Sequence, residues 1–112
     1  MAIARSLFAR GAVHLVARDP TKGSEIRKTS PCLIVSPNEL NAYLRTVVVA
    51  PMTTGGHAYP WRVPCRFRRR SGYVAADQLR TVDTERLVKR LGTLAPATVS
   101  EVLRVLQEMF AE

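Results

Sequence analysis

The sequence predicts a mostly β domain with a C-terminal α-helix, built on a small, strongly bent antiparallel sheet or barrel. Its apolar residues occur in short runs rich in β-branched side chains, which is typical of buried strands. The runs follow one another too closely for the helical crossovers that join parallel strands. Helical spacing of apolar residues is sustained only near the C-terminus. At 112 residues, the chain is expected to be a single domain, 1–112.

The first half of the chain is predicted to contain three buried strands separated by polar segments. Each strand is a nearly continuous apolar run: 11–17, 31–36 and 46–51. Two polar stretches that contain glycine and proline are expected to be exposed loops: 19–29 and 53–60. The segment 37–44 begins with proline and could hold a helical turn.

Residues 61–68 show the clearest period-two alternation in the chain. The apolar face is predicted to point inward: Trp61, Val63, Cys65 and Phe67. The basic face is predicted to point into water: Arg62, Arg66 and Arg68. Because Pro64 cannot donate a hydrogen bond to a neighbouring strand, this strand is expected at a sheet edge or at a bulge.

The last third of the chain is predicted to contain a turn at 71–72, strands at 73–82 and 88–94, and the long helix. Proline suits the first helical position, so the helix is expected to begin at Pro96. Its apolar stripe follows i, i+3, i+4, i+7 spacing: Val99, Val102, Leu103, Leu106 and Phe110. The stripe is expected to pack on the sheet, although part of it could serve a dimer.

The charge balance indicates a polyanionic partner. There are 17 Lys and Arg residues against nine Asp and Glu, which gives a net charge of +8. Five arginines fall within nine residues that contain no acid: Arg62, Arg66, Arg68, Arg69 and Arg70. Such clustering favours nucleic acid, with an acidic protein segment as the other candidate.

Other classes of protein and site are not favoured by the sequence. No apolar run approaches the roughly 20 residues of a membrane span, and no signal peptide is recognised, so the cytoplasm is the expected location. Cys32 and Cys65 lack metal-ligand spacing and are expected to be buried free thiols. We therefore expect no metal and no other cofactor.

Several stretches resemble, in order and spacing, those of the MazF/PemK toxins of type II toxin–antitoxin systems. They are Gly11–Val16, Asp19–Thr29, Pro31–Ser36, Thr46–Thr54, Asp77–Asp83 and Arg86–Gly92. The resemblance implies an SH3-like or CcdB-like antiparallel barrel that forms a homodimer. It also implies a sequence-specific, metal-independent endoribonuclease that cuts single-stranded RNA (mRNA). A cognate MazE-like antitoxin would block the RNA groove with an acidic, disordered tail.

The resemblance also suggests catalytic residues, each of which has a plainer alternative. Thr53 matches a threonine that contacts the phosphate, but could instead cap a strand end. Glu25 matches a glutamate implicated in some members, but could be an exposed loop acid. Asp77 matches an aspartate with a catalytic role in at least one relative, but could form a structural hydrogen bond.

One departure from the family concerns its main catalytic arginine, which usually precedes the proline of the second strand. Here that residue is Ser30, before Pro31. Serine has no guanidinium fork for phosphate oxygens, and loss of one such contact commonly costs about 10²–10³ in rate. Arg27 or Lys28 could substitute, and Arg27 is the favoured candidate. Two milder departures are Ala12 and His14, and His14 is expected to pack inside its strand.

Candidate RNA-binding residues combine cations with one hydroxyl and one aromatic ring: Lys22, Lys28, Ser30, Tyr59, Arg62, Arg66, Arg68 and Arg80. Tyr59 is favoured over Trp61 as a base-stacking ring, because Trp61 shares the predicted inward face. Three functions remain open. The first is an active endoribonuclease with Thr53 and Arg27 in its site. The second is a catalytically impaired protein of the same fold that only binds RNA or antitoxin. The third is a CcdB-like topoisomerase inhibitor.

Overall fold

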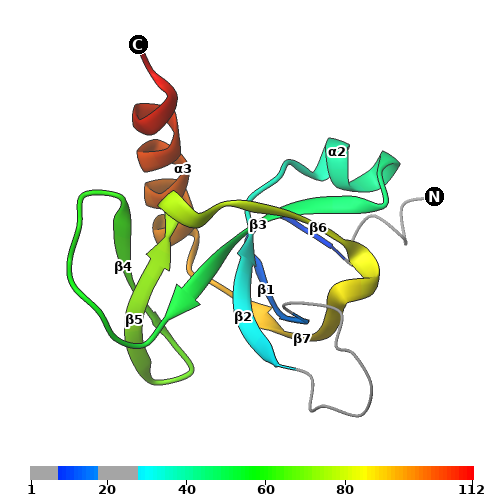
Figure 1. Ribbon diagram of the computed structural model, residues 1–112, viewed down its shortest axis with the longest axis horizontal. Coiled ribbons are helices and arrows are strands. Elements are labelled where there is room, and N and C mark those ends of the chain that lie inside the picture. Colours follow the sequence, from blue (N-terminus) through cyan, green and yellow to red (C-terminus); the bar gives the residue numbers. More distant parts are fainter. Residues whose placement is uncertain (1–7, 18–27) are drawn as a thin grey trace.

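A computed structural model of the chain describes residues 8–17 and 28–112. It contains a curved antiparallel sheet with a long helix, α3 (Pro96–Phe110), packed beside it (Figure 1). The strands are β1 (Ala12–Ala17), β2 (Thr29–Ile34), β3 (Thr46–Thr53), β4 (Arg62–Phe67), β5 (Arg70–Ala75), β6 (Arg80–Asp83) and β7 (Leu87–Thr93). The short helix α2 (Asn38–Tyr43) precedes β3, and two single 3-10 turns are Ala76–Gln78 and Thr84–Arg86. The predicted fold class is confirmed.

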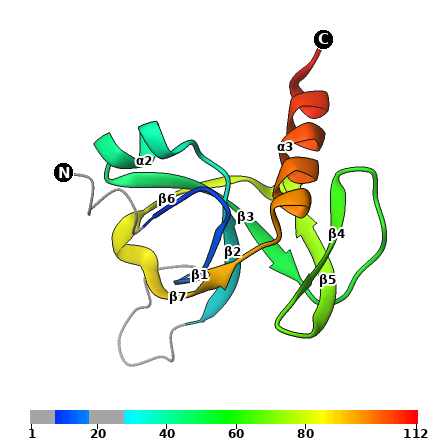
Figure 2. The same ribbon diagram turned by 180° about the vertical axis from the view of Figure 1, so that it is seen from behind.

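Strand β3 joins the two halves of the sheet. The strand order is β4-β5-β3-β2-β1-β7, with β6 also paired to β3. The first half of β3 pairs with β6, and its last two residues, Met52 and Thr53, pair with β5. The sheet thus curls into a half-barrel on one side and continues into the β4–β5 hairpin on the other (Figure 2). Strand β4 lies at an edge, which confirms the prediction made from Pro64.

The hydrophobic core has two parts, and β1 and β2 contribute to both. Val13 and Leu33 point toward the cluster beneath α3, which includes Val102 and Val105. The residues on the opposite face of the same strands point into the half-barrel: Ala12, Val16, Cys32 and Ile34. Because both faces of these strands are buried, their sequences are continuous apolar runs without alternation.

Helix α3 begins at Pro96 as predicted and buries a slightly different stripe. Val102 and Val105 are buried against the sheet, while Val99, Leu103 and Leu106 pack partly against the same cluster. Phe110, predicted to belong to the stripe, is 73% exposed because it lies on the last turn, beyond the sheet. No helix among residues 8–17 and 28–112 is long and apolar enough to cross a membrane.

Three further local predictions were wrong, and all concern residues 61–82. The turn lies at Arg68-Arg69, whose φ angles are 52° and 67°, whereas residues 71–72 lie inside β5. A two-residue hairpin turn requires this left-handed backbone, and the sequence offers no glycine or asparagine there to signal it. The predicted strand 73–82 is interrupted by the 3-10 turn at 76–78. Trp61 precedes the first residue of β4 and is 40% exposed rather than inward.

Candidate active site and RNA-binding surface

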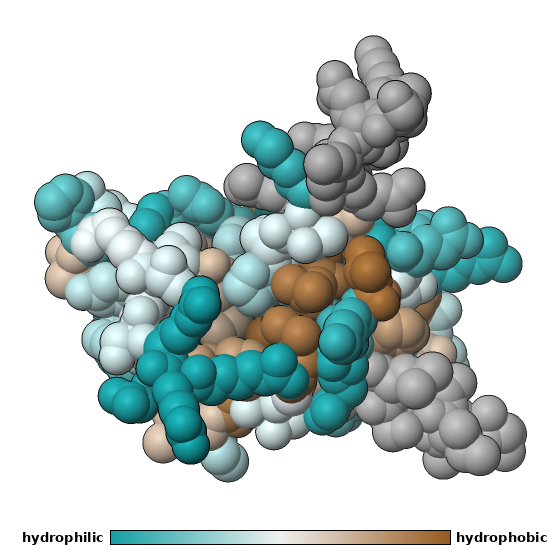
Figure 3. Space-filling view, turned by 90° about the horizontal axis from the view of Figure 1, so that it is seen from below, coloured by the Kyte–Doolittle hydropathy of each residue, from teal (hydrophilic) through white to brown (hydrophobic). Residues whose placement is uncertain are grey.

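A pocket of about 340 Å³ lies where the end of β3 meets the β4–β5 hairpin. Its apolar walls come from four strands: Pro31, Met52, Cys65, Phe67 and Leu91. Its polar lining comes from the end of β3 and from the hairpin: Thr53, Thr54, Arg68, Arg70 and Ser71. Figure 3 shows apolar surface on this side of the molecule, with hydrophilic side chains lying across it.

Thr53 is placed in the pocket by a close approach between two strands. It is the last residue of β3 and pairs with Tyr73 of β5. A Cβ atom at Gly72 would lie 1.9 Å from the carbonyl oxygen of Thr53, so only glycine fits at this crossing. The Thr53 hydroxyl donates to the carbonyl oxygen of Gly55 at 3.1 Å. The predicted phosphate-contacting hydroxyl therefore lies on the pocket wall, at the start of the loop.

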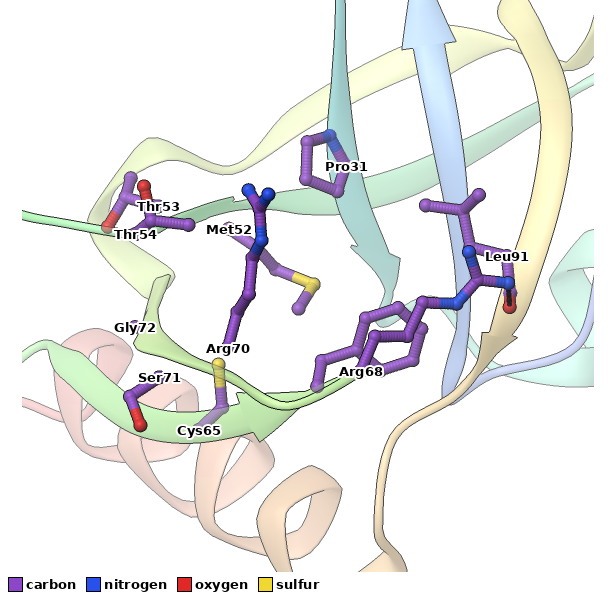
Figure 4. A pocket seen from close by; sticks show the side chains of 11 residues that line it. Pro31, Met52, Thr53, Thr54, Cys65, Arg68, Arg70, Ser71, Gly72 and Leu91 are labelled. Atoms are coloured by element: carbon purple, nitrogen blue, oxygen red, sulfur yellow. Dashed lines mark hydrogen bonds between the residues drawn. The ribbon is translucent and has the colours of Figure 1, made fainter.

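Arg70 is the cation that the sequence did not single out for this pocket. It is the first residue of β5, and its side chain points into the pocket toward the side where Thr53 and Pro31 lie (Figure 4). Within the described part of the chain, its guanidinium makes no hydrogen bond or ion pair. Because the turn was predicted at 71–72, Arg70 was not expected to begin a strand. The observed turn at Arg68-Arg69 makes Arg70 the first residue of β5, and its side chain enters the pocket.

The neighbouring arginines of the cluster are held differently. The Arg68 guanidinium donates to the carbonyl oxygen of Leu91 in β7 and lies 5.6 Å from the centre of the Phe67 ring. Arg66 is exposed and lines a second, more open hollow with Thr54. The predicted phosphate-binding role of both residues stays a prediction, and Arg68 would have to exchange a backbone partner to fulfil it.

Arg62 and Asp77 form a bidentate ion pair. The Arg62 Nε atom donates to Asp77 Oδ1 at 2.7 Å and its Nη2 atom donates to Oδ2 at 3.2 Å. The hydrogen bond from Arg62 lowers the pKa of the Asp77 carboxyl, and the same bond raises the pKa of Arg62. One predicted RNA-binding cation and one predicted catalytic acid are thus bound to each other.

The aromatic rings of Tyr59 and Trp61 lie beside this ion pair. Their ring centroids are 5.6 Å apart and their planes differ by 7°. The Arg62 guanidinium carbon lies 5.6 Å from the centre of the Tyr59 ring. Tyr59 is 43% exposed, which agrees with its predicted availability. Because Trp61 is also exposed, it offers a second ring for stacking. The alternation pattern had instead predicted that Trp61 points inward.

Ser30 does not share the pocket of Thr53. It alternates with Pro31 along β2 and lines a cavity of about 100 Å³ inside the half-barrel, together with Gln78 and Arg80. Arg80 thus places a cation in the same cavity as Ser30, the position where the family usually has arginine. Lys28 is exposed just before β2. Three predicted site residues lie outside the described residues: Lys22, Glu25 and Arg27.

His14 and the two cysteines suggest no further chemistry at this site. His14 is buried with its ring 5.8 Å from Phe8, which agrees with packing. Cys32 is buried and Cys65 half-buried, both as free thiols, and burial raises the pKa of Cys65. Residues 8–17 and 28–112 contain no group of three or more His, Cys, Asp or Glu side chains that could hold a metal ion.

Comparison with known proteins identifies relatives along nearly the whole chain. A family model described as the PemK-like, MazF-like toxin of type II toxin–antitoxin system matches residues 9–110. Endoribonuclease PemK of Escherichia coli is 37% identical over 105 residues, covering 88% of this chain and 79% of the relative.

Solved structures of similar fold include toxins bound to antitoxins. One is a mycobacterial endoribonuclease in complex with its cognate antitoxin (TM-score 0.74, 31% identity, 89% of this chain and 91% of that chain). Another is a MazE–MazF structure from Deinococcus radiodurans (TM-score 0.76, 25% identity, 90% and 93%).

Proposed function

The chain belongs to the PemK-like, MazF-like toxin family of type II toxin–antitoxin systems, and we propose that it is the endoribonuclease toxin of such a pair. The observation that carries the proposal is the pocket in which the Thr53 hydroxyl and the Arg70 guanidinium line the same space. Relatives named as endoribonucleases favour an active enzyme over the impaired, binding-only alternative that Ser30 had suggested.

The substrate is single-stranded RNA, and the reaction needs no metal. The ribose 2′-oxygen attacks the adjacent phosphorus, the bond between phosphorus and the 5′-oxygen breaks, and a 2′,3′-cyclic phosphate and a 5′-hydroxyl result. One group must accept the 2′-hydroxyl proton and another must protonate the leaving 5′-oxygen. The phosphoryl oxygens gain negative charge in the transition state, and preorganised donors there supply much of the catalysis.

Thr53 and Arg70 are suited to stabilise that charge. A guanidinium fork matches two phosphate oxygens, and the Thr53 hydroxyl can donate to a third when it exchanges the Gly55 carbonyl oxygen for the phosphate. Met52, Phe67 and Leu91 give the same pocket apolar walls, which would strengthen the attraction to a phosphate that displaces water from them. Glu25 and Arg27 remain candidates for proton transfer and for a second phosphate contact.

The protein acts in the cytoplasm as a homodimer and is inhibited by a cognate MazE-like antitoxin. Support for the antitoxin comes from relatives whose solved structures contain one. An acidic antitoxin segment would complement the net charge of +8 and compete with RNA for the same cations. RNA binding is therefore expected to weaken steeply as salt rises.

The test is cleavage of a long single-stranded RNA in EDTA, with the 5′ ends of the products mapped. Cuts at a recurring short sequence, leaving 2′,3′-cyclic phosphate ends, are expected. Arg70→Gln should lower kcat by about 10²–10³, as the loss of a transition-state donor does. Arg69→Gln is the matched control, because it removes the same charge from the exposed turn outside the pocket lining. Intact RNA, or equal effects of the two substitutions, would contradict the proposal.

A further inference from the structure

We propose that Tyr59 and Trp61 form a stacking platform for one nucleobase of the RNA, and that the Arg62–Asp77 ion pair positions it. The proposal rests on the RNA-cleaving function proposed above and adds a binding subsite outside the pocket of Thr53. It also assigns Asp77 a positioning role in place of the catalytic role that the resemblance implied.

The two rings are arranged before any ligand arrives. Pro60 stands between them and fixes its own φ angle, while the residue before a proline is restricted to extended conformations. The nearly parallel rings, 7° apart in orientation, are offset so that aromatic surface stays open. Tyr59 and Trp61 are 43% and 40% exposed, so about two-fifths of each residue is available to a ligand.

Backbone hydrogen bonds hold the segment that carries the rings. The amide of Arg62 donates to the carbonyl oxygen of Tyr59 at 2.9 Å. The amide of Ala76 donates to the carbonyl oxygen of Trp61 at 3.1 Å. Both residues are therefore fixed to the start of β4 and to the 3-10 turn after β5, which reduces the entropy lost when a base stacks on them.

The Arg62–Asp77 ion pair holds the Tyr59 ring of the platform in place. Arg62 faces the Tyr59 ring at 5.6 Å, which is within the range of a cation–π interaction. Its guanidinium is at the same time held by both oxygens of Asp77. A guanidinium that is held on one side by a carboxylate and lies against a ring on the other is poorly placed to bind phosphate. Its geometry instead serves to orient Tyr59.

A nucleobase is the occupant that best fits this chemistry. Every base has a planar face that stacks on tyrosine or tryptophan, whatever its hydrogen-bonding edge. The phosphates attached to a base also match the cationic surroundings of a chain with net charge +8, including the exposed Arg66. The platform therefore adds affinity without choosing a base, and sequence preference must come from elsewhere in the groove.

The position of Asp77 argues against a role in proton transfer. Its carboxylate already accepts two hydrogen bonds from Arg62, which lower its pKa and reduce its strength as a base. Asp77 does not line the pocket that contains Thr53 and Arg70. Its loss is expected to loosen the platform rather than to slow the chemical step.

Trp61 is the only tryptophan of the chain, so its fluorescence reports directly on the platform. The ligand is a short single-stranded oligodeoxynucleotide, which lacks the 2′-hydroxyl and cannot be cut by the proposed reaction. Its partner is an abasic oligomer with the same number of phosphates. The base-bearing oligomer should quench Trp61 and the abasic one should not, although both bind in a salt-dependent manner.

Substitutions then separate stacking from charge. Tyr59→Leu should raise the Kd of the base-bearing oligomer about 5- to 150-fold and leave that of the abasic oligomer unchanged. Tyr43→Leu is the matched control, because Tyr43 is 79% exposed and lies on α2, on the opposite side of the molecule from β4 (Figures 1 and 2). Asp77→Asn should weaken both the quenching and the binding, and raise KM for RNA while kcat is retained.

Two results would overturn the platform, and a third would overturn the positioning role of Asp77. Equal quenching by the abasic oligomer would show that charge alone is sensed. An unchanged Kd in Tyr59→Leu, with a changed oligomeric state in sedimentation, would identify the rings as an interface between copies of the chain. A fall in kcat with unchanged KM in Asp77→Asn would restore its catalytic role. Failure of the wild-type protein to cut RNA would instead overturn the proposed function, since the oligomer measurements require no cleavage.

Discussion

The two ends of the β4–β5 hairpin hold their arginines in opposite ways. At the open end, Arg62 is bound by both oxygens of Asp77 and lies against the Tyr59 ring. At the turn end, Arg70 reaches into a pocket beside Thr53 with no ion-pair partner among residues 8–17 and 28–112. The arginines of this basic run therefore do not form one uniform surface. The position of each arginine within the hairpin decides whether its charge stays available to a ligand.

The pairing at the open end and its absence at the turn end have different physical consequences. An arginine already neutralised by a carboxylate contributes rigidity, because its hydrogen bonds and its charge are satisfied. An unpaired arginine in a partly apolar pocket remains available for an anion, and the surrounding apolar atoms strengthen that attraction. We therefore expect the turn end to affect catalysis and the open end to affect binding.

The largest effect is expected at the turn end, from Thr53→Val. The substitution keeps the shape of the side chain and removes its hydroxyl. If that hydroxyl donates to the phosphate in the transition state, kcat should fall about 10²–10³-fold with little change in KM. Single-turnover cleavage of RNA measures this. Equal rates for the variant and the wild type would show that Thr53 only caps the strand end.

The next largest effect is expected from a substitution where β3 crosses β5, which supports the turn end of the hairpin. Gly72→Ala places a methyl group 1.9 Å from the Thr53 carbonyl oxygen, so the strands must separate. The free energy of unfolding should drop by about 3 kcal/mol in urea denaturation. Gly55→Ala is the control, because a Cβ there meets no atom within 4 Å. Similar stability of the two variants would refute the proposed role of Gly72.

Backbone strain at the turn predicts a smaller effect of opposite sign. Arg69 has a φ of 67°, a conformation that costs a non-glycine residue about 1 kcal/mol. Arg69→Gly should relieve part of this cost, so that thermal unfolding occurs at an equal or higher temperature, whereas Arg69→Val should lower it. A clear loss of stability in Arg69→Gly would mean that the arginine makes contacts that outweigh the strain.

The smallest effect is expected from the ion pair at the open end. Arg62 lowers the pKa of Asp77, so the pair stabilises the fold above the ordinary Asp pKa of about 3.9 and is lost as pH falls through the lower, folded-state value. Asp77→Asn should therefore be less stable than the wild type by about 0.2–1 kcal/mol at pH 7. The gap should begin to narrow below about pH 4 and close below the lower, folded-state pKa of Asp77. A gap that persists in acid would point to packing instead of charge.

Most of the architecture followed from local patterns. The apolar runs at β1, β2 and β3 required burial on both faces, and Pro96 with the apolar spacing after it required a helix that packs on a sheet. The edge position of β4 followed from Pro64. Each of these conclusions depends on residues close together in the sequence, which is why periodicity was sufficient.

The site was less accessible to sequence reasoning, because its residues come together only through strand pairing. The turn at Arg68-Arg69 carries no turn-forming residue, so a shift of three positions hid the entry of Arg70 into the pocket. The partnership of Arg62 with Asp77 spans 15 residues and depends on the register between β4 and β5.

The sequence by itself determined the fold class, the family and the basic character of the surface, since these depend on composition, periodicity and the order of motifs. Only the tertiary structure decided which arginines form hydrogen bonds and ion pairs, and which side chains share a cavity. Hydrogen bonds and ion pairs between strands depend on register, and one residue of register moves a side chain to the opposite face of the sheet. The separation of Arg70 from Arg62 along one hairpin is the clearest result of that dependence.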